Sequence, residues 1–330
     1  MAYAQARELD ADAIPVIDIT PLRDGTDVAG VAAQLHAASQ GLGFLYVKGH
    51  GIPDEMIQAA RDRAYDFFRA DPAQKETVRV SDKHRGWIGR GGAKMQDDAK
   101  ADLKESFLWG WQDSAGWTPE DHDLRGPNQW PDFQPDLAFA AMDYFHAAHE
   151  VAHDLMRGFA VGLGLEPGFF LRTSDRPLSR ASFVYYPAQS ADLGADQFGV
   201  GPHTDFGVLT VLCQDDVGGL QVQDVNGEWL QAPPIPGTLI VNVADLLSRW
   251  TAGAYKSTPH RVVNSSGRER LSLVLAYDPD PETMIDPRDV FDDPGPDAAE
   301  PITCGDYLVW RFAKAFGYRQ ANAADAAGKD

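Results

Sequence analysis

Cysteine is scarce in this chain, since only Cys213 and Cys304 occur among 330 residues. Two cysteines do not make the multi-bridge framework that stabilises small secreted domains. Cys213 lies within the apolar run VLTVLC, where we expect a reduced thiol in the core. The first residues contain no basic segment followed by an apolar one, so no secretory signal is predicted. These features favour a reducing, cytoplasmic location.

The chain also has few positively charged residues relative to negatively charged ones, and it has no long apolar run. The chain has 29 Lys and Arg against 49 Asp and Glu, which gives a formal net charge of −20. A surface of this sign repels phosphate backbones and anionic lipids, so we expect no nucleic-acid partner and no membrane partner. No apolar run approaches the length of a membrane-spanning helix. Apolar residues still make up 44% of the chain, which is enough for a sizeable core.

The hydrophobic pattern changes from helical to β-type along the chain. A short buried strand is predicted at residues 14–19, followed by helices at 28–40, 52–70 and about 132–163. Residues 81–130 read as irregular. After Arg176, short β-type runs separated by Gly, Pro, Asn and Asp are typical of an antiparallel sandwich or barrel. The sequence therefore predicts helices first and then a β core of roughly a hundred residues.

The segment HEVAH at residues 149–153 matches a zinc motif in which two histidines one helical turn apart bind the ion. Zinc in a hydrolase needs a third protein ligand. Met156 stands where the extended form of the motif has glycine, and Glu166 lies beyond the predicted helix, next to Pro167. We interpret the match as an accident of helical sequence, and a zinc hydrolase stays as a remote alternative.

A second histidine cluster has a better structural context. PHTDF leads directly into the strand GVLTVL, so His203 and Asp205, two residues apart in an extended segment, point the same way. Another β-type run begins at His260. Two histidines and one carboxylate on one side of an octahedron suit Fe(II), because they leave positions open for other ligands. The alternative is an H-x-D turn with an unrelated His260.

The residues after His260 supply an anion-binding group. HRVVNSSGRERLSL is predicted to form a hairpin that turns near residues 265–266 and places Arg270 within about one residue of facing His260. Arg270 and Ser272 would then point into the same interior. Because a buried arginine is costly unless it meets an anion, a dicarboxylic acid that chelates the metal could reach Arg270 with its far end. The alternative is a structural Arg–Asp pair.

Taken together, these motifs resemble the Fe(II)/2-oxoglutarate-dependent dioxygenases, in the branch similar to isopenicillin N synthase. The resemblance runs from about residue 12 to 318 and rests on several segments in family order: IPVIDI, GLGFLYVKGHGI, DFFRADPAQK, DLKESFLWGW, HTDFGVLTVL, GGLQV, HRVVN and RLSLVLAYDPD. It implies a mainly β fold with flanking helices around a double-stranded β-helix (jelly roll). The implied sections are an N-terminal region at 12–130, a long helix and connection at 131–175, the jelly-roll core at 176–285 and a C-terminal extension at 286–330, all in one compact unit.

The resemblance also implies a site and a reaction. Iron would be held by His203, Asp205 and His260, and the 5-carboxylate of 2-oxoglutarate by Arg270, Ser272 and Tyr186 of FVYYP. Oxidative decarboxylation of 2-oxoglutarate by O2 would be coupled to hydroxylation, desaturation or ring closure of a small organic molecule, with ascorbate as a possible reductant. We expect a monomer or weak homodimer.

Two features limit what the resemblance implies. Val184 stands where some plant members carry asparagine, and LVLAY follows Ser272 where many members have a Phe-rich run. The Arg270-x-Ser272 pair also occurs in oxidases of the isopenicillin N synthase or aminocyclopropane carboxylate oxidase type, which use no 2-oxoglutarate. That reaction and a catalytically silent binding protein stay as alternatives, although the iron triad is intact.

Candidate substrate contacts come from composition alone. The Gly-rich segment HRGWIGRGGAK at 84–94 reads as a lid that carries Arg85, Trp87 and Arg90, and its basic residues favour a carboxylate-bearing substrate. Aromatic and polar residues elsewhere are further candidates for the pocket lining, although such residues lie more often in a core or on a surface. They are Trp109, Trp111, Phe206, Gln221 and Trp250.

Overall fold

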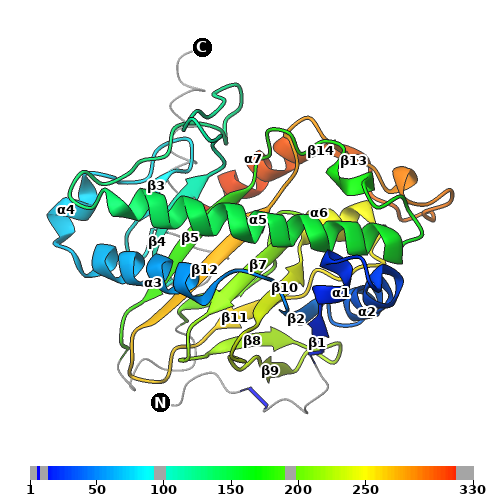
Figure 1. The fold of residues 1–330 in the computed structure, drawn as a ribbon, viewed down its shortest axis with the longest axis horizontal. Helices are drawn as coiled ribbons and strands as arrows, with labels where there is room; N and C mark the ends of the chain where they lie inside the picture. Colours follow the sequence, from blue (N-terminus) through cyan, green and yellow to red (C-terminus); the bar gives the residue numbers. More distant parts are fainter. Residues whose placement is uncertain (1–5, 8–13, 93–101, 190–197, 317–330) are drawn as a thin grey trace.

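The computed structural model describes residues 6–7, 14–92, 102–189 and 198–316, whose elements build a two-sheet β core with helices packed around it (Figure 1). The larger sheet has eight strands in the order β1 (Val16–Asp18), β2 (Phe44–Lys48), β10 (Leu239–Val243), β7 (Leu209–Gln214), β12 (Arg270–Tyr277), β5 (Arg180–Tyr186), β4 (Glu105–Gly110) and β3 (Gly86–Ile88). The smaller sheet has the order β6 (Val200–His203), β11 (His260–Val262), β8 (Leu220–Gln223) and β9 (Trp229–Gln231). A further pair joins β13 (Met284–Ile285) to β14 (Ile302–Thr303).

Helices cover the outer face of the larger sheet. Among them, α5 (Asp136–Gly162) runs across the sheet and contacts β7 and β12, with α2 (Val28–Gln40) and α3 (Asp54–Arg69) packed against it (Figure 1). The remaining helical elements are α1 (Thr20–Arg23), α4 (Pro72–Glu76), η1 (Phe169–Leu171), α6 (Asp245–Trp250), η2 (Pro287–Asp289) and α7 (Cys304–Ala315). No helix within the described ranges combines the length and apolarity needed to cross a membrane.

Strand alternation divides the interior into two cores. On β7, Leu209, Val211 and Cys213 point outward into the core beneath α5, whereas Leu212 packs against the inner core between the two sheets. The same period of two applies to β12, where Leu271, Leu273 and Leu275 belong to the outer core. The side chains at the intervening positions of these strands face the space between the two sheets. Polar residues at these positions do not contribute to apolar packing, so they call for another explanation.

The predicted fold class is confirmed, and two details of the prediction are corrected. Helices α2, α3 and α5 lie where helical periodicity placed them. Residues 81–130 are less irregular than expected, because β3 and β4 extend the larger sheet. Strand β4 is buried along its whole length and so lacks the polar–apolar alternation that marks a one-sided strand.

The predicted hairpin from His260 to Arg270 does not form. Strand β11 pairs with β6 and β8 in the smaller sheet, whereas β12 pairs with β5 and β7 in the larger one. The turn around residues 265–266 thus crosses from one sheet to the other. His260 and Arg270 still share an interior because the two sheets face each other, so the inference about a common site holds for a different structural reason.

Candidate active site

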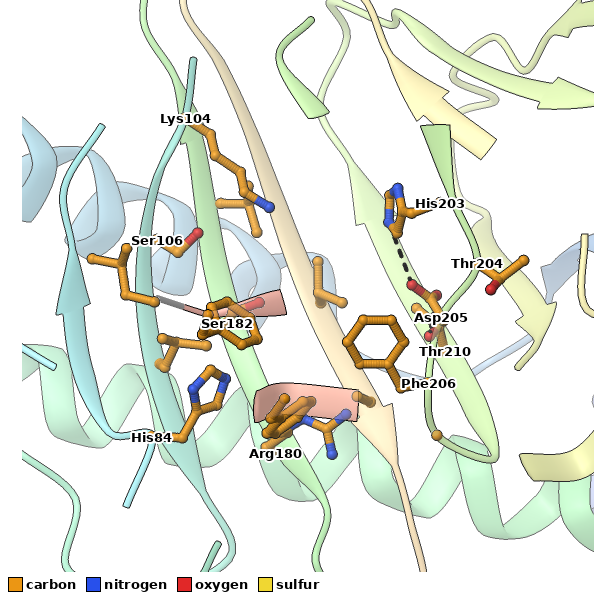
Figure 2. A pocket seen from close by; sticks show the side chains of 18 residues that line it. His84, Lys104, Ser106, Arg180, Ser182, His203, Thr204, Asp205, Phe206 and Thr210 are labelled. Carbon is orange, nitrogen blue, oxygen red and sulfur yellow. Dashed lines mark hydrogen bonds and ion pairs between the residues drawn. The ribbon is translucent and has the colours of Figure 1, made fainter. Parts of the chain in front are cut away.

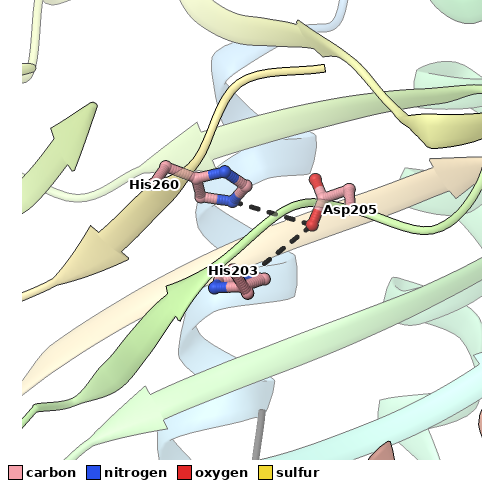
Figure 3. Close-up of side chains that lie close together, drawn as sticks. All are labelled: His203, Asp205 and His260. Carbon is pink, nitrogen blue, oxygen red and sulfur yellow. Dashed lines mark ion pairs between the residues drawn. The ribbon is translucent and has the colours of Figure 1, made fainter. Parts of the chain in front are cut away.

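Three side chains converge where the smaller sheet meets the loop after β6. Nε2 of His203 and Nε2 of His260 each lie 3.6 Å from Oδ1 of Asp205 (Figure 3). His203 and His260 are paired across β6 and β11, and Asp205 follows two residues after His203. In the described part of the chain, this is the only group of three or more His, Cys, Asp or Glu residues whose ligand atoms come close enough to hold a metal ion.

The ligand atoms are kept available by hydrogen bonds at the opposite side of each group. Nδ1 of His203 is 2.8 Å from the carbonyl of Gly201, and Nδ1 of His260 is 3.2 Å from that of Thr258. A carbonyl only accepts, so each Nδ1 carries the proton and each Nε2 keeps a free lone pair. These bonds fix both imidazoles in the tautomer that binds metal through Nε2.

The carboxylate of Asp205 is held in the same way. Its Oδ2 accepts hydrogen bonds from Oγ1 of Thr210 at 2.5 Å and from Nδ2 of Asn242 at 2.9 Å, which leaves Oδ1 facing the two imidazoles. Thr210 and Asn242 are cross-strand neighbours on β7 and β10. Neither residue was predicted from the sequence, although an asparagine within the apolar strand LIVNV is a usable signal.

The protonation states of the site also suit a cation. Burial lowers the pKa of His203 to about 3, and the nearby His260 adds to the effect. Burial alone would raise the pKa of Asp205, but the two imidazoles and the hydrogen bonds from Asn242 and Thr210 lower it to about 2. At neutral pH His203 is therefore neutral and Asp205 ionised, and these are the forms that bind metal.

We expect Asn242→Ala to weaken metal binding without removing a ligand. With one of its two donors lost, Oδ2 of Asp205 is held less firmly, and Fe(II) affinity should fall by about 10-fold or more. Anaerobic titration with Fe(II) measures this affinity. Asn226→Ala, in the exposed turn between β8 and β9, is the matched control and should leave it unchanged. Wild-type affinity in a folded Asn242 variant would show that this hydrogen bond does not position the carboxylate.

A second polar group lies on the inner face of β12. Arg270 is 1% exposed; its Nε donates to the carbonyl of Gly218 at 2.6 Å and one terminal nitrogen donates to Oε1 of Gln214 at 3.3 Å. The other terminal nitrogen, Nη1, and Oγ of the neighbouring Ser272 are buried and have no hydrogen-bond partner among the described residues. Buried donors are almost always satisfied, so two such donors side by side indicate a missing acceptor.

The residues around this pair fit a carboxylate. The ring of Tyr186 lies 4.7 Å from the Arg270 guanidinium carbon, in register with it across β5 and β12. Burial raises the pKa of Tyr186 to about 12, so its hydroxyl stays protonated and can donate. The walls nearby belong to the inner apolar core, including Val184, Val200 and Val262. A planar anion here would meet a guanidinium, a hydroxyl and little water.

A cavity of about 150 Å³ opens beside the triad (Figure 2). His203, Asp205 and Phe206 form one wall, and the inner faces of β4, β5, β7 and β12 form the other. Among the predicted substrate contacts, Phe206 lines this cavity, and it also borders a more open hollow toward α7.

The other substrate predictions are corrected by their positions. Arg85 is buried, donates to backbone carbonyls, including that of Leu124, and does not line the cavity. Its neighbour His84 does line it. Arg90 is largely exposed and lies 3.8 Å from Glu105. Gln221 accepts from Arg261 on the outward side of the smaller sheet. Trp250 packs against Phe169 and Phe170 in the outer core.

The predicted lid is only partly described. Residues 86–88 form the edge strand β3 rather than a loop over the site, and residues 93–94 lie outside the described ranges. Trp87 donates to Glu105 at 2.9 Å. Trp109 is fully buried against Phe183, and Trp111 packs on the same outer core. None of these three tryptophans lines the cavity beside the triad.

HEVAH lies on α5, on the far side of the larger sheet from the triad. His149 is buried, with Nε2 at 3.1 Å from Oγ of Ser179, and burial lowers its pKa to about 3. The ring of His153 lies 4.4 Å from that of His149, but no third ligand joins the pair among the described residues. The motif therefore occupies a helix–sheet contact.

Comparison with known proteins agrees with this geometry. The sequence model of the 2OG-Fe(II) oxygenase superfamily matches residues 179–279, and that of the N-terminal region named for the non-haem dioxygenase in morphine synthesis matches residues 14–133. Homoarginine-6-hydroxylase of Glycine max is 34% identical over 300 residues, which cover 85% of this chain and 89% of that protein. The chain belongs to the 2OG-Fe(II) oxygenase superfamily.

Further relatives support the same assignment. The 2-oxoglutarate-Fe(II) type oxidoreductase hxnY of Emericella nidulans is 33% identical over 284 residues, which cover 81% of this chain and 80% of that protein. A full-length protein of Neurospora crassa, solved in complex with alpha-KG and thymine, superimposes with a TM-score of 0.81 at 28% identity, covering 94% of this chain and 99% of that one.

The superfamily assignment defines the type of enzyme and its cofactors. This oxygenase is an oxidoreductase that uses Fe(II), 2-oxoglutarate and O2, and its fold is the jelly roll of its solved relatives. This activity is favoured over the three alternatives, which were a zinc hydrolase, a catalytically silent binding protein and an oxidase that uses no 2-oxoglutarate.

Proposed function

We propose that His203, Asp205 and His260 bind Fe(II), and that Arg270 and Ser272 bind the distal carboxylate of 2-oxoglutarate. The observation that carries the proposal is the pair of unsatisfied donors, Nη1 of Arg270 and Oγ of Ser272, on the inner face that also faces the triad. A dicarboxylate that chelates the metal through its keto-acid end satisfies both donors with its other end. Tyr186 supports this role by covering the guanidinium and offering its hydroxyl.

The donor set fits iron for chemical reasons. Two imidazole nitrogens and one carboxylate oxygen on one side of an ion leave several coordination positions open, which is the arrangement of non-haem Fe(II) oxygenases. When bound, Fe(II) and 2-oxoglutarate supply the oxidising chemistry, in which O2 and 2-oxoglutarate give succinate and CO2 while one oxygen atom enters a C–H bond of the substrate. The protein selects that bond and keeps water away from it.

The side chains of this chain have separate tasks in that reaction. Gly201 and Thr258 fix the imidazole tautomers, while Thr210 and Asn242 direct Oδ1 of Asp205 toward the metal position. The apolar inner core around Arg270 excludes solvent and so strengthens its attraction for a carboxylate. The cavity beside Asp205 receives the primary substrate, a small organic molecule, and Phe206 forms part of its wall.

Coupled turnover tests the proposed function. Purified protein supplied with Fe(II), ascorbate and O2 should form succinate only when 2-oxoglutarate is added, and a suitable C–H compound should raise the rate. Oxidation of a compound with no 2-oxoglutarate present would favour the oxidase reaction instead.

We also propose a cytoplasmic location, and we propose that the protein is a monomer or a weak homodimer. Sedimentation of the purified chain tests the proposed oligomeric state.

A further inference from the structure

Arg180 lies at the opposite end of the paired strands β5 and β12 from Arg270, and its largely buried side chain lines the cavity beside the triad. Asn242, Thr210, Ala276 and Arg180 occupy one cross-strand row on the inner face of the larger sheet. Thr210 bonds Asp205, and neighbouring strands are about 4.8 Å apart, so the Arg180 backbone is about 10 Å from that of Thr210. A molecule in the cavity would thus lie between Arg180 and Asp205, which both line it (Figure 2).

The contacts of Arg180 leave most of its donors available. Its Nη1 donates to Oδ2 of Asp278 at 2.5 Å, and its guanidinium carbon lies 4.6 Å from the ring of Phe312. Within the described residues, Asp278 is the sole hydrogen-bond partner of this side chain. A guanidinium has five N–H donors, and the side chain of Arg180 lines the cavity at 12% exposure. Its unused edge therefore faces the ligand space.

The charges around the cavity favour an anion at this end. Of the described residues that line the cavity, Lys104 and Arg180 are cationic and Asp205 is the one carboxylate; Lys104 is itself paired with Asp102, behind the lining, at 3.7 Å. Asp278 offsets the charge of Arg180 from behind, but the Arg85 guanidinium packs over Gly110, which is the register partner of Arg180 on β4. Cations therefore outnumber carboxylates in the lining itself, in contrast to the formal charge of −20 of the whole chain.

The remaining walls limit the size and character of the ligand. Phe206, Phe312 and Phe316 supply aromatic surface, and the cavity of about 150 Å³ is about the size that accommodates benzene. His84 lines the same end of the cavity and has a left-handed backbone conformation, with φ at 62°. This conformation is energetically unfavourable for a residue other than glycine, and such strained residues often occur at ligand sites. The end near Arg180 is thus suited to a small molecule with an apolar body and one charged group.

We propose that Arg180 binds a carboxylate of the primary substrate, so that the enzyme oxidises small organic acids with an apolar or aromatic body. The proposal rests on the function proposed above, which leaves Arg270 to 2-oxoglutarate. The sequence predicted a carboxylate-bearing substrate from Arg85 and Arg90, and we now assign the binding of that carboxylate to Arg180, which lines the cavity. The planar guanidinium, with one edge held by Asp278, presents parallel donors that match the two oxygens of a carboxylate.

Ligand-observed NMR on the protein loaded with Zn(II), a diamagnetic substitute for Fe(II), and saturated with 2-oxoglutarate tests the proposal directly. The probes are benzoate, phenylacetate and hexanoate, each paired with its primary amide, which has the same shape without the charge. We expect at least one acid to bind about 100-fold more tightly than its amide, because a site built for a charged group rejects an analogue that lacks it. Equal binding of every acid and its amide, or binding of neither, would overturn the proposal.

Variants of Arg180 identify the side chain responsible. Arg180→Gln should remove the preference for the acid, and Arg180→Lys, which keeps a charge beside Asp278, should retain only part of it. If Arg180→Gln folds poorly because Asp278 is left unpaired, the double variant Arg180→Gln with Asp278→Asn removes that charge and tests the same point. An unchanged acid preference in folded Arg180→Gln, or in the folded double variant, would exclude Arg180 as the anion-binding group.

The two proposals fail in different ways. In every variant of Arg180, 2-oxoglutarate should still bind with a dissociation constant within about 3-fold of the wild type, since Arg270 lies at the other end of the site. If the wild type does not bind 2-oxoglutarate, the proposed function is wrong. If it binds 2-oxoglutarate normally while the acids and amides behave alike, only the substrate class is wrong.

Discussion

Asp205→Ala should abolish both iron binding and coupled turnover. The carboxylate is the one anionic member of the triad, and its Oδ1 lies 3.6 Å from both Nε2 atoms. Without it, two imidazoles and no carboxylate remain in a partly buried site. Loss of a residue that merely supports a ligand costs roughly 10- to 100-fold in metal affinity, so loss of the ligand itself should cost more than about 100-fold. Bound Fe(II) and substrate-stimulated succinate measure the two effects.

Asp216→Ala is the matched control for this experiment. Asp216 is an exposed aspartate paired with Arg268 on the surface, and its removal should change neither quantity. The fold should survive in the Asp205 variant, because Asn242 and Thr210 then lose an acceptor but no core packing is removed. Coupled turnover close to the wild-type rate in Asp205→Ala would contradict the assignment of this carboxylate to iron.

Arg270→Ala should remove 2-oxoglutarate binding while iron still binds. Truncating one partner of a buried charge pair costs about 2–5 kcal/mol, which corresponds to roughly 30- to 5,000-fold in affinity. Ser272 and Tyr186 remain, but neither carries a positive charge. The measurement is the visible charge-transfer absorption of the Fe(II)–2-oxoglutarate chelate during anaerobic titration. The absorption should need far more 2-oxoglutarate to appear in the variant than in the wild type.

Two further variants separate charge from geometry in this test. Arg268→Ala removes an exposed arginine just before β12 and should leave 2-oxoglutarate affinity unchanged. Arg270→Lys keeps the charge but loses the planar set of parallel donors, so its affinity should be intermediate. Undiminished 2-oxoglutarate affinity in Arg270→Ala would mean that another residue holds the carboxylate, and Arg180 would then be the first to examine.

The metal site was predictable because its signal is local. His203 and Asp205 are two apart in an extended segment, and an extended backbone places such residues on one side whatever the rest of the fold does. His260 and Arg270 required a guess about pairing, and the predicted hairpin was wrong because the chain changes sheets between β11 and β12. Their common interior survived that error, since strand alternation alone sends both side chains inward.

The substrate end of the site was not predictable in this way. Arg180 opens a strand whose sequence, RASFVYY, shows nothing to distinguish a cavity arginine from a surface one. Its position depends on β5 pairing with both β12 and β4, which is a property of the sheet order. Arg85 and Arg90 were chosen from composition, and tertiary packing placed one against backbone carbonyls and left the other largely exposed. Such contacts depend on tertiary pairing rather than on a local pattern.

Anomalous diffraction at the iron edge from crystals grown with Fe(II) and 2-oxoglutarate under anaerobic conditions tests the central claim most directly. We predict one strong peak within coordination distance of Nε2 of His203, Nε2 of His260 and Oδ1 of Asp205, and a carboxylate of 2-oxoglutarate bound to Arg270 and Ser272. A peak between His149 and His153 on α5, or an iron ion bound away from Asp205, would contradict it.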